Sequence, residues 1–267
     1  MADFYLLGNA SRSQMFGCVI CGEGHTVVFD GGTVHDGEQM IRFLKETGRT
    51  FVDAWFFTHP HHDHVGCMEY LRQKGEGICV KKVCHAFPDL EKGPFSTLFR
   101  SEFEGQLWKG IWEWDKAFSV HRVKEGDLFD FGDFKIRVLR TFHPDLVDIN
   151  NSSTVYRIEG TEKSILILGD LGVPGGEDVK RRCPQSLLKA DYTQMAHHGQ
   201  GGVSKEFYEY IGVKRCIWPT PLWLWNNDRG EGFDTGPYLT VRTREWMDEM
   251  GVMEHIVEKD GIQKILI

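Results

Sequence analysis

The sequence predicts an α/β fold in which helices cover the faces of a mixed β-sheet. Runs of β-branched and aromatic residues alternate with amphipathic helical patterns through much of the chain. In the middle, several strand-like runs follow one another with no helical pattern between them, which excludes a regular repeat of strand and helix. The chain has 267 residues, of which 41% are hydrophobic, so we expect one large domain spanning residues 1–267.

The first half of the chain is expected to begin with consecutive strands, after which helices and strands alternate. Each strand is predicted from a short apolar run that ends at a turn signal. The first helix has an apolar stripe, with Asp36 and Gln39 as a capping pair at its start and Gly48 at its end. The strands expected in this half cover about residues 4–8, 16–21, 26–32, 52–58 and 78–84, and the helices about 36–48, 65–75 and 96–117.

The second half is expected to contain consecutive strands first and alternating elements later. The expected strands cover about residues 119–123, 134–142, 153–160, 164–170, 192–196 and 215–219, the helices about 177–189, 204–211 and 239–250, and two further strands end the chain. We also expect a helical insertion at 85–120 and an aromatic loop at 218–238.

Composition limits the partners and the compartment. The formal net charge is −8, whereas nucleic-acid binders usually present basic surfaces, so we expect a small-molecule substrate and no nucleic acid. No stretch approaches the ~18 apolar residues of a transmembrane helix, and the N-terminus lacks the positive charge of a secretion signal. The seven cysteines show no disulfide spacing. Together these features predict a cytoplasmic protein without membrane contact.

Cys18 and Cys21 form a C-x-x-C pattern within "GCVICG", which reads as a strand. Residues three apart on a strand point to opposite faces, so the two side chains cannot easily hold one metal ion. We therefore expect two buried thiols.

The stretch "THPHHDHVG", residues 58–66, holds four potential metal ligands: His59, His61, Asp63 and His64. These side chains either form a solvated polar loop or share a cation. Their position after an apolar strand favours the cation, because a turn from strand to helix at a sheet edge brings neighbouring side chains to one point. Imidazole and carboxylate suit Zn, Mn or Fe, and the absence of thiolates argues against a structural zinc site.

Two further apolar strands end in residues of the same kind. "SILILGDLG" leads into Asp170, and "ADYTQMAHHGQGG" leads into His197 and His198. An aspartate at the end of a strand is, taken alone, equally well a turn or cap residue. Together with the first cluster, these residues favour a metal centre.

These motifs resemble those of the metallo-β-lactamase superfamily of binuclear metal hydrolases. "TVVFDGG" is similar to the family's early strand that ends in a structural aspartate, here Asp30. The resemblance covers roughly residues 15–220 and implies a four-layer αββα sandwich. Within the family, "NNSSTVYRIEG", "SILILGDLG" and "LLKADYTQMAHHGQGG" resemble one branch, which includes the hydrolase domain of bacterial DNA-uptake competence proteins and the teichoic-acid phosphorylcholine esterases.

The resemblance implies two divalent metal ions, Zn or else Mn or Fe, which two overlapping sets of residues hold. The first set is His59, His61 and Asp170; the second is Asp63, His64, His198 and the same Asp170. It also implies catalytic roles for Asp63 and for His197, which would stabilise or protonate the leaving oxygen. An exchange of roles between His197 and His198 is the alternative.

One position departs from the family pattern. Most members have a third histidine for the first ion, shortly before the strand that leads to the bridging aspartate. Here that place is taken by Asn150 or Asn151, and His143 in "TFHPD" is the alternative ligand. If none of them binds, the first ion is held weakly and a mononuclear centre results.

The predicted function is metal-dependent hydrolysis by a hydroxide that bridges two metal ions, with its pKa lowered from 15.7 to about 7. The branch resemblance favours a phosphodiesterase or another phosphoesterase, and the acidic charge favours a small or zwitterionic substrate. The same centre also suits an acyl hydrolase acting on a β-lactam, lactone or thioester, and a non-hydrolytic di-iron protein is a further alternative.

Two groups of tryptophans are interpreted either as pocket walls or as core. They are Trp108, Trp112 and Trp114 in the predicted insertion, and Trp218, Trp223 and Trp225 in the aromatic loop. An aromatic wall can hold a quaternary ammonium group by cation–π attraction. The helical spacing of Trp108 and Trp112 favours ordinary packing for that pair.

Overall fold

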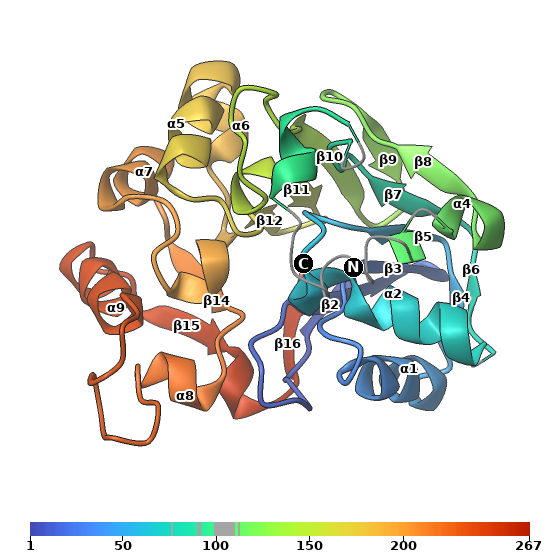
Figure 1. Ribbon diagram of the computed structural model, residues 1–267, viewed down its shortest axis with the longest axis horizontal. Helices are drawn as coiled ribbons and strands as arrows, with labels where there is room; N and C mark the ends of the chain where they lie inside the picture. Colours follow the sequence, from blue (N-terminus) through green and yellow to red (C-terminus); the bar gives the residue numbers. More distant parts are fainter. Residues whose placement is uncertain (76, 90–91, 99–109, 112) are drawn as a thin grey trace.

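Two mixed β-sheets lie face to face, and helices cover the outer face of each (Figure 1). The computed structural model describes residues 1–75, 77–89, 92–98, 110–111 and 113–267. In spatial order the first sheet contains β16 (Gln263–Leu266), β1 (Asp3–Leu6), β2 (Gly17–Gly22), β3 (His25–Asp30), β5 (Ala54–Phe56), β7 (Val83–His85) and β8 (Val120–Arg122). The second contains β15 (Glu254–Val257), β14 (Arg215–Trp218), β13 (Tyr192–Gln194), β12 (Ser164–Ile167), β11 (Val155–Glu159), β10 (Lys135–Arg140) and β9 (Leu128–Asp130). A short pair, β4 (Phe51–Val52) with β6 (Cys79–Val80), forms a separate two-stranded sheet.

The helices form the two outer layers. On the first sheet lie α1 (Gly37–Glu46) and α2 (His62–Lys74), followed later in the chain by α4 (Trp114–Ala117). On the second lie α5 (Val173–Arg182), α6 (Gln185–Leu188), α7 (Lys205–Ile211), α8 (Leu222–Trp225) and α9 (Thr240–Glu249). The 3₁₀ turns are η1 (Pro94–Thr97), η2 (Asn150–Ser152), η3 (Ala196–Gly199) and η4 (Glu258–Asp260). The predicted αββα sandwich is confirmed, and none of the described helices is long and apolar enough to cross a membrane.

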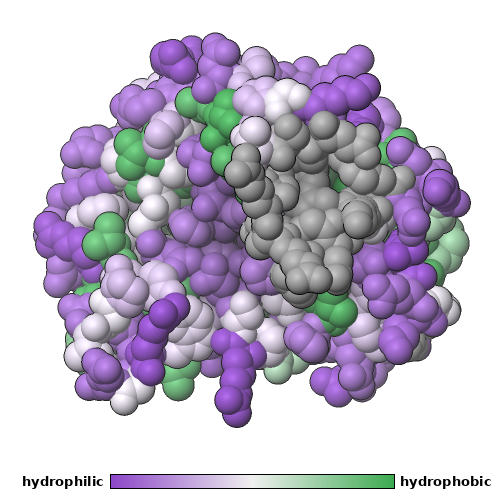
Figure 2. All heavy atoms as spheres, in the orientation of Figure 1, coloured by the Kyte–Doolittle hydropathy of each residue, from purple (hydrophilic) through white to green (hydrophobic). Residues whose placement is uncertain are grey.

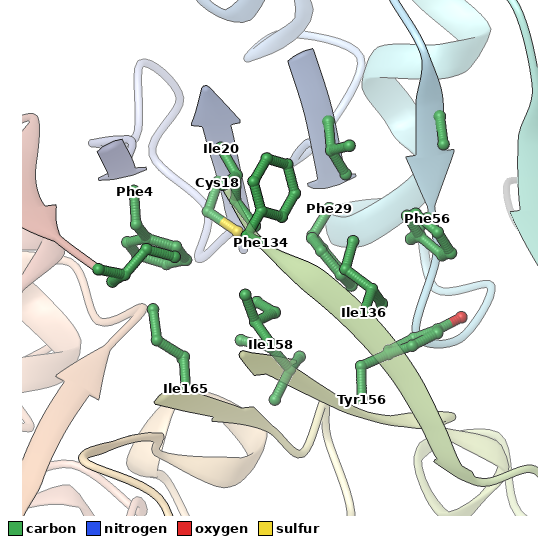
Figure 3. Close-up of a cluster of buried hydrophobic side chains, with 14 of the residues drawn as sticks. Phe4, Cys18, Ile20, Phe29, Phe56, Phe134, Ile136, Tyr156, Ile158 and Ile165 are labelled. Atoms are coloured by element: carbon green, nitrogen blue, oxygen red, sulfur yellow. The ribbon is translucent and has the colours of Figure 1, made fainter. Parts of the chain in front are cut away.

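Three apolar clusters hold these layers together. The central one fills the space between the sheets, where Phe4, Ile20 and Phe29 of the first sheet point toward Ile158 and Ile165 of the second (Figure 3). The other two lie between each sheet and its own helices. Strands buried on both faces read as nearly continuous apolar runs, which is why the strands before the site were visible in the sequence.

The two cysteines of the C-x-x-C pattern confirm the expected alternation along β2. Cys18 belongs to the cluster between the sheets, and Cys21 belongs to the cluster under α1 and α2. Burial raises the pKa of both thiols, so neither is a ready metal ligand.

Several elements differ from the expected ones. Helix α2 begins at His62, three residues early, so that the metal-ligand motif runs into its first turn. The predicted helix at 177–189 is two helices, because Pro184 interrupts it, and α5 begins at Val173 with a proline in its first turn. Strand β9 was not predicted. Of the predicted insertion at 85–120, the structure describes the last residue of β7, η1, α4, the first residue of β8 and short connections. The rest, with Trp108 and Trp112, lies outside the described residues.

The capping pair predicted for α1 is wrong, because both side chains do something else. Asp36 precedes the helix but makes no side-chain cap. Its carboxylate instead accepts hydrogen bonds from the backbone of Ala10 and Ser11 and from Thr33. The Gln39 amide donates to the carbonyl of Gly8. The start of α1 therefore anchors the loop that follows β1.

Candidate metal centre

The predicted site residues lie where parallel strands end at one edge of the sandwich. Pairing changes from antiparallel to parallel at β3 in the first sheet and at β12 in the second. The carboxyl ends of β3, β5, β12 and β13 lead into Asp30, His59, Asp170 and His197, respectively. Loops at the carboxyl ends of parallel strands, at such a change of order, are where α/β proteins place functional groups.

One cluster of ligand atoms consists of His59, His61 and Asp170, all within 4.8 Å of one another. The His59 Nε2 atom lies 3.1 Å from His61 Nδ1 and 3.8 Å from Asp170 Oδ2. His59 and Asp170 are buried, whereas His61 is partly exposed.

A second cluster consists of Asp63, His64, Asp170 and His198, again within 4.8 Å, and all four are buried. Asp170 Oδ2 lies 3.3 Å from the Nε2 atom of His64 and 3.3 Å from that of His198. His198 Nε2 also lies 3.4 Å from Asp63 Oδ2. Asp170 thus belongs to both clusters.

The unused hydrogen-bonding capacity of these clusters fits bound cations. The buried atoms His64 Nε2, His198 Nε2 and Asp170 Oδ1 have no hydrogen-bond partner among the described residues. Buried polar atoms are rarely left in this state unless an ion or water satisfies them. The donors are imidazole nitrogens and carboxylate oxygens, which suit Zn, Mn or Fe.

The second nitrogen of each buried ring is held by the protein. His64 Nδ1 lies 2.8 Å from Asp30 Oδ2, and His198 Nδ1 lies 2.8 Å from the carbonyl oxygen of Pro219. His59 Nδ1 lies 3.1 Å from the hydroxyl of Thr58. A proton on Nδ1 of His64 and His198 leaves Nε2 of both rings free to bind an ion, the arrangement usual around metal ligands.

Asp30 is the residue on which this orientation depends. It ends β3 with φ of 48°, and two glycines follow it. Its carboxylate accepts hydrogen bonds from the backbone nitrogen of Thr58 at 2.8 Å and from the Thr58 hydroxyl at 2.7 Å, besides facing His64. Asp30 therefore fixes the first residue of the metal-ligand motif and one of its rings.

The side chains of the centre balance one another's charge. Burial opposes ionisation of His198, but Asp170 and Asp63 outweigh it and raise its pKa to about 10. Burial likewise opposes the charged form of His64, but Asp170 and Asp30 raise its pKa. The pKa of Asp170 falls well below its usual range, because His198 and His64 outweigh the effect of burial.

His197 lies beside this centre but in neither cluster. Its backbone and that of His198 both have positive φ, 50° and 53°, which is unfavourable for residues other than glycine and is frequent at functional sites. The backbone nitrogen of His197 donates to the carbonyl of Gly169, next to Asp170. Burial lowers the pKa of the His197 ring, so the ring is neutral at pH 7.

Two of the alternative ligands for the first ion, His143 and Asn151, occupy different places. His143 has a side chain 35% exposed, accepts a hydrogen bond from the backbone of Asp145, and belongs to neither cluster. The Asn151 side-chain oxygen accepts hydrogen bonds from the backbone nitrogens of Gly172 and Gly175, at 3.0 and 2.9 Å. Asn151 thus holds the first turn of α5, directly after the Asp170 loop.

Sequence reasoning missed Gln14. Its side-chain nitrogen donates to Asp63 Oδ2 at 3.2 Å, and its oxygen accepts from Gln200 at 2.8 Å. It lies 49 positions before Asp63 in a loop without a motif, so only the folded arrangement brings it to the centre.

The tryptophans separate into core and surface. Trp114 and Trp218 are buried in the apolar clusters. Trp225 packs against the guanidinium of Arg244, whose central carbon lies 4.3 Å from the ring centroid. Trp223 lines a cavity between the loop that follows β1 and the segment from Pro221 to Gly230.

Comparisons with known proteins give a consistent family and fold. A model of the Metallo-beta-lactamase superfamily matches residues 18–211. ComE operon protein 3 of Bacillus subtilis (strain 168) is 30% identical over 181 residues, which are 67% of this chain and 21% of that protein, so the chain spans about a fifth of its length.

Two solved structures are similar throughout. The metallo-beta-lactamase fold protein YhfI from Bacillus subtilis has a TM-score of 0.57 at 13% identity, with 99% of each chain covered. Tm1679, a metal-dependent hydrolase of the beta-lactamase superfamily, has a TM-score of 0.55 at 11% identity, with 100% of this chain and 99% of that chain covered. At these identities the likeness shows the fold.

Proposed function

The chain belongs to the metallo-beta-lactamase superfamily and is therefore a metal-dependent hydrolase. From that premise we propose that it hydrolyses phosphodiesters of small molecules at a centre of two metal ions. The observation that carries the proposal is that Asp170 belongs to two clusters of ligand atoms at once. A carboxylate shared in this way suits two neighbouring cations better than one.

In this proposal each cluster holds one ion. His59, His61 and Asp170 hold the first, and Asp63, His64, His198 and Asp170 hold the second. Zn is the expected metal, with Mn and Fe as alternatives of the same ligand preference. Bound divalent ions supply a nucleophile at neutral pH by lowering the pKa of water, and they neutralise charge that develops on phosphoryl oxygens.

The chain's own residues do the rest. Asp30 and the Pro219 carbonyl fix the rings of His64 and His198, so both Nε2 atoms face Asp170. The neutral ring of His197 donates a hydrogen bond to the leaving oxygen in this proposal, which the lowered pKa of the ring supports.

A phosphodiester is the proposed substrate because of two observations together. The match to ComE operon protein 3 agrees with the branch of the family that the strand-end motifs resemble, and that resemblance favours phosphoester hydrolysis. The net charge of −8 argues for a small substrate over a polynucleotide. Both arguments concern this chain, which matches only a fifth of that relative.

The test combines metal content with turnover. Purified protein with added Mn or Zn is assayed on bis(p-nitrophenyl) phosphate, and Asp170→Ala is compared with Asp53→Ala. Asp53 is a matched control, since it is a carboxylate that accepts a backbone hydrogen bond from Thr26, far from both clusters. We expect nearly two ions per unchanged chain, and a loss of turnover of at least about 100-fold only in the Asp170 variant.

Other outcomes of the same test point to other functions. Two bound ions without turnover of the diester, but with turnover of a lactam, lactone or thioester, identify an acyl hydrolase. Iron without hydrolysis of either kind identifies a di-iron protein. Protein that binds no metal overturns the proposal.

A further inference from the structure

A cavity of about 740 Å³ lies between the loop that follows β1 and the segment that contains α8. The loop contributes Asn9, Ser11 and Arg12, and the other wall runs from Pro221 to Gly230. The predicted function assigns no role to this cavity. Figure 2 shows that the molecule is also hollowed near the middle of the face it presents, where hydrophilic residues predominate.

Both walls of the cavity continue directly into residues that touch the centre. Arg12 precedes by two positions Gln14, whose amide bonds to Asp63. Pro221 follows Thr220, whose hydroxyl donates to the His198 carbonyl at 2.8 Å. Residues two positions apart have Cα atoms at most about 7 Å apart. Short chain segments therefore join both walls of the cavity to the Asp63 and His198 side of the centre.

The cavity is positively charged in an acidic protein. Arg12 and Arg229 line it, and Asp228 is the one carboxylate among its described lining residues. The Asp228 carboxylate is engaged by the backbone nitrogens of Gly230 and Gly232, at 2.7 and 2.9 Å. The chain as a whole carries a net charge of −8, so two guanidinium groups at one cavity form a local positive region that attracts anions.

Partly buried contacts fix the loop that carries Arg12, and a surface contact fixes the exposed side chain of Arg229. The loop of Arg12 is fixed by Asp36, which accepts hydrogen bonds from Ala10 and Ser11. The guanidinium of Arg229 donates to the Tyr238 hydroxyl and stacks on its ring, 5.1 Å from the centroid. Trp223 packs edge-on against the same Tyr238, at 5.7 Å between centroids. Groups held in advance lose less entropy when a ligand binds.

The aromatic lining does not suit a quaternary ammonium group. Trp218 is buried, and the ring of Trp225 is already covered by Arg244 and Lys259. Trp223 remains, beside two guanidinium groups that repel a cation. Its indole Nε1 is buried and has no hydrogen-bond partner among the described residues.

We propose that this cavity binds a second anionic group of the substrate, a phosphate or a carboxylate on the alcohol part of the diester, and that Arg12 and Arg229 determine this specificity. The inference rests on the proposed diesterase function of the centre. It replaces the expected zwitterionic substrate with a dianionic or trianionic one.

The test uses propyl p-nitrophenyl phosphate and three counterparts whose propyl chain ends in phosphate, carboxylate or trimethylammonium. All four release the same leaving group, so the ratio of kcat/KM values reports recognition of the chain end. We expect the phosphate and carboxylate ends to be preferred to the neutral end, and the ammonium end to be disfavoured. Arg12→Gln and Arg229→Gln should each reduce the preference by about fivefold or more. Lysine at either position should restore part of it.

Arg42→Gln is the matched control, since Arg42 is exposed on α1, away from the cavity, and should leave the ratio unchanged. Equal kcat/KM values for all four chain ends, or a preference for the ammonium end, would overturn the inference while leaving the diesterase function intact. If no diester is hydrolysed, the proposed function fails, and calorimetry decides on the cavity. Propane-1,3-diyl bisphosphate should then bind more tightly than propyl phosphate, and equal affinity would overturn the inference.

Discussion

Asp30 acts on the centre without belonging to either ligand cluster. Its carboxylate contacts Thr58 and the Nδ1 atom of His64, on the far side of the ring from Asp170. Partners of this kind keep a ligand ring in one orientation and raise its basicity.

Asp30→Asn is therefore expected to weaken metal binding by about 10- to 100-fold, because the ring of His64 loses its anionic partner. Metal affinity measured by competition with a chromophoric chelator checks this. Asp53→Asn, which changes a carboxylate bonded to Thr26 and His25, should leave the affinity unchanged. Equal affinities of the two variants would show that Asp30 serves only the fold.

Glu258 is a buried acid for which the proposed mechanism has no role. It follows β15, and neither carboxylate oxygen has a well-formed hydrogen bond among the described residues. Burial raises its pKa well above the ordinary 4.5; His198 opposes this shift, and Asp36 adds to it.

A carboxyl group whose pKa is raised on folding contributes its full stability below the unfolded-state pKa of about 4.5. This contribution is lost as the pH rises toward the folded-state pKa. Glu258→Gln removes this loss. The free energy of unfolding of the variant, relative to that of the unchanged protein, should therefore rise by about 1.4 kcal/mol for each pH unit within that window. Urea unfolding of both proteins at pH 5, 6 and 7 measures the difference. Parallel curves would mean that Glu258 is ionised in the folded protein.

At the scale of elements, α5 depends on a residue outside itself. The Asn151 oxygen accepts from Gly172 and Gly175, and its amide donates to Asp148. Arg140, which is buried, ties the same turn to the helix through Asp178 and the carbonyl of Asn151. These contacts hold the segment that carries Asp170.

Asn151→Ala should lower the free energy of unfolding by about 1–2 kcal/mol, because two backbone donors lose their acceptor. Asn151→Asp keeps the acceptor for Gly172 and Gly175 but loses the donor to Asp148 and faces its carboxylate, so it should restore only part of that stability. Denaturant unfolding and metal content are measured together. A change in metal content without a change in stability would instead make Asn151 a ligand, and the aspartate variant would then bind metal more tightly.

Elements were predictable where one local signal dominated. Apolar strands such as β12 and the late helix α9 were found, since burial and periodicity mark them directly. The start of α2 was placed three residues late, because His62, Asp63 and His64 are weak helix formers. Asp36 carries a capping signal, but its carboxylate makes more hydrogen bonds with Ser11 and Thr33 than a cap would provide. Such distant competition is invisible in a local pattern.

At the scale of the whole molecule, the two sheets have the same pairing order. In each, three antiparallel pairs are followed by three parallel pairs. In each, an aspartate lies at or just after the end of the strand at the change: Asp30 is the last residue of β3, and Asp170 follows β12 by three positions. In each, the next parallel strand leads to histidines. The ligand types were readable from the sequence, but this correspondence was not, since no repeat is visible. Gln14 and the Pro219 carbonyl were hidden for a related reason: only the meeting of distant loops brings them to the centre.

Metal binding should release protons. His64 and His198 have raised pKa values in the ion-free chain, about 10 for His198, so both are protonated at pH 7 and must lose a proton to bind an ion. Each released proton weakens metal binding by about tenfold for a fall of one pH unit. Calorimetry in two buffers of different ionisation enthalpy should give about two protons per filled centre from these rings, and about one more where a metal-bound water ionises. A count of zero would contradict the charge balance described above.

Between its last two strands the chain passes from one sheet to the other: β15 belongs to the second sheet and β16 to the first. As a result Ala2 and Ile267 are backbone hydrogen-bond partners: the Ala2 nitrogen lies 3.2 Å from the Ile267 oxygen, and the Ile267 nitrogen lies 2.9 Å from the Ala2 oxygen. The two ends lie side by side (Figure 1). The polypeptide is thus almost a closed ring. A short Gly–Ser connection between these ends, with new ends opened in the exposed turn at Gly48, should give a circular permutant with unchanged strand pairing. Its metal content and melting temperature should stay close to those of the original chain, whereas a markedly lower melting temperature would show that the pairing of β16 with β1 does not tolerate the connection.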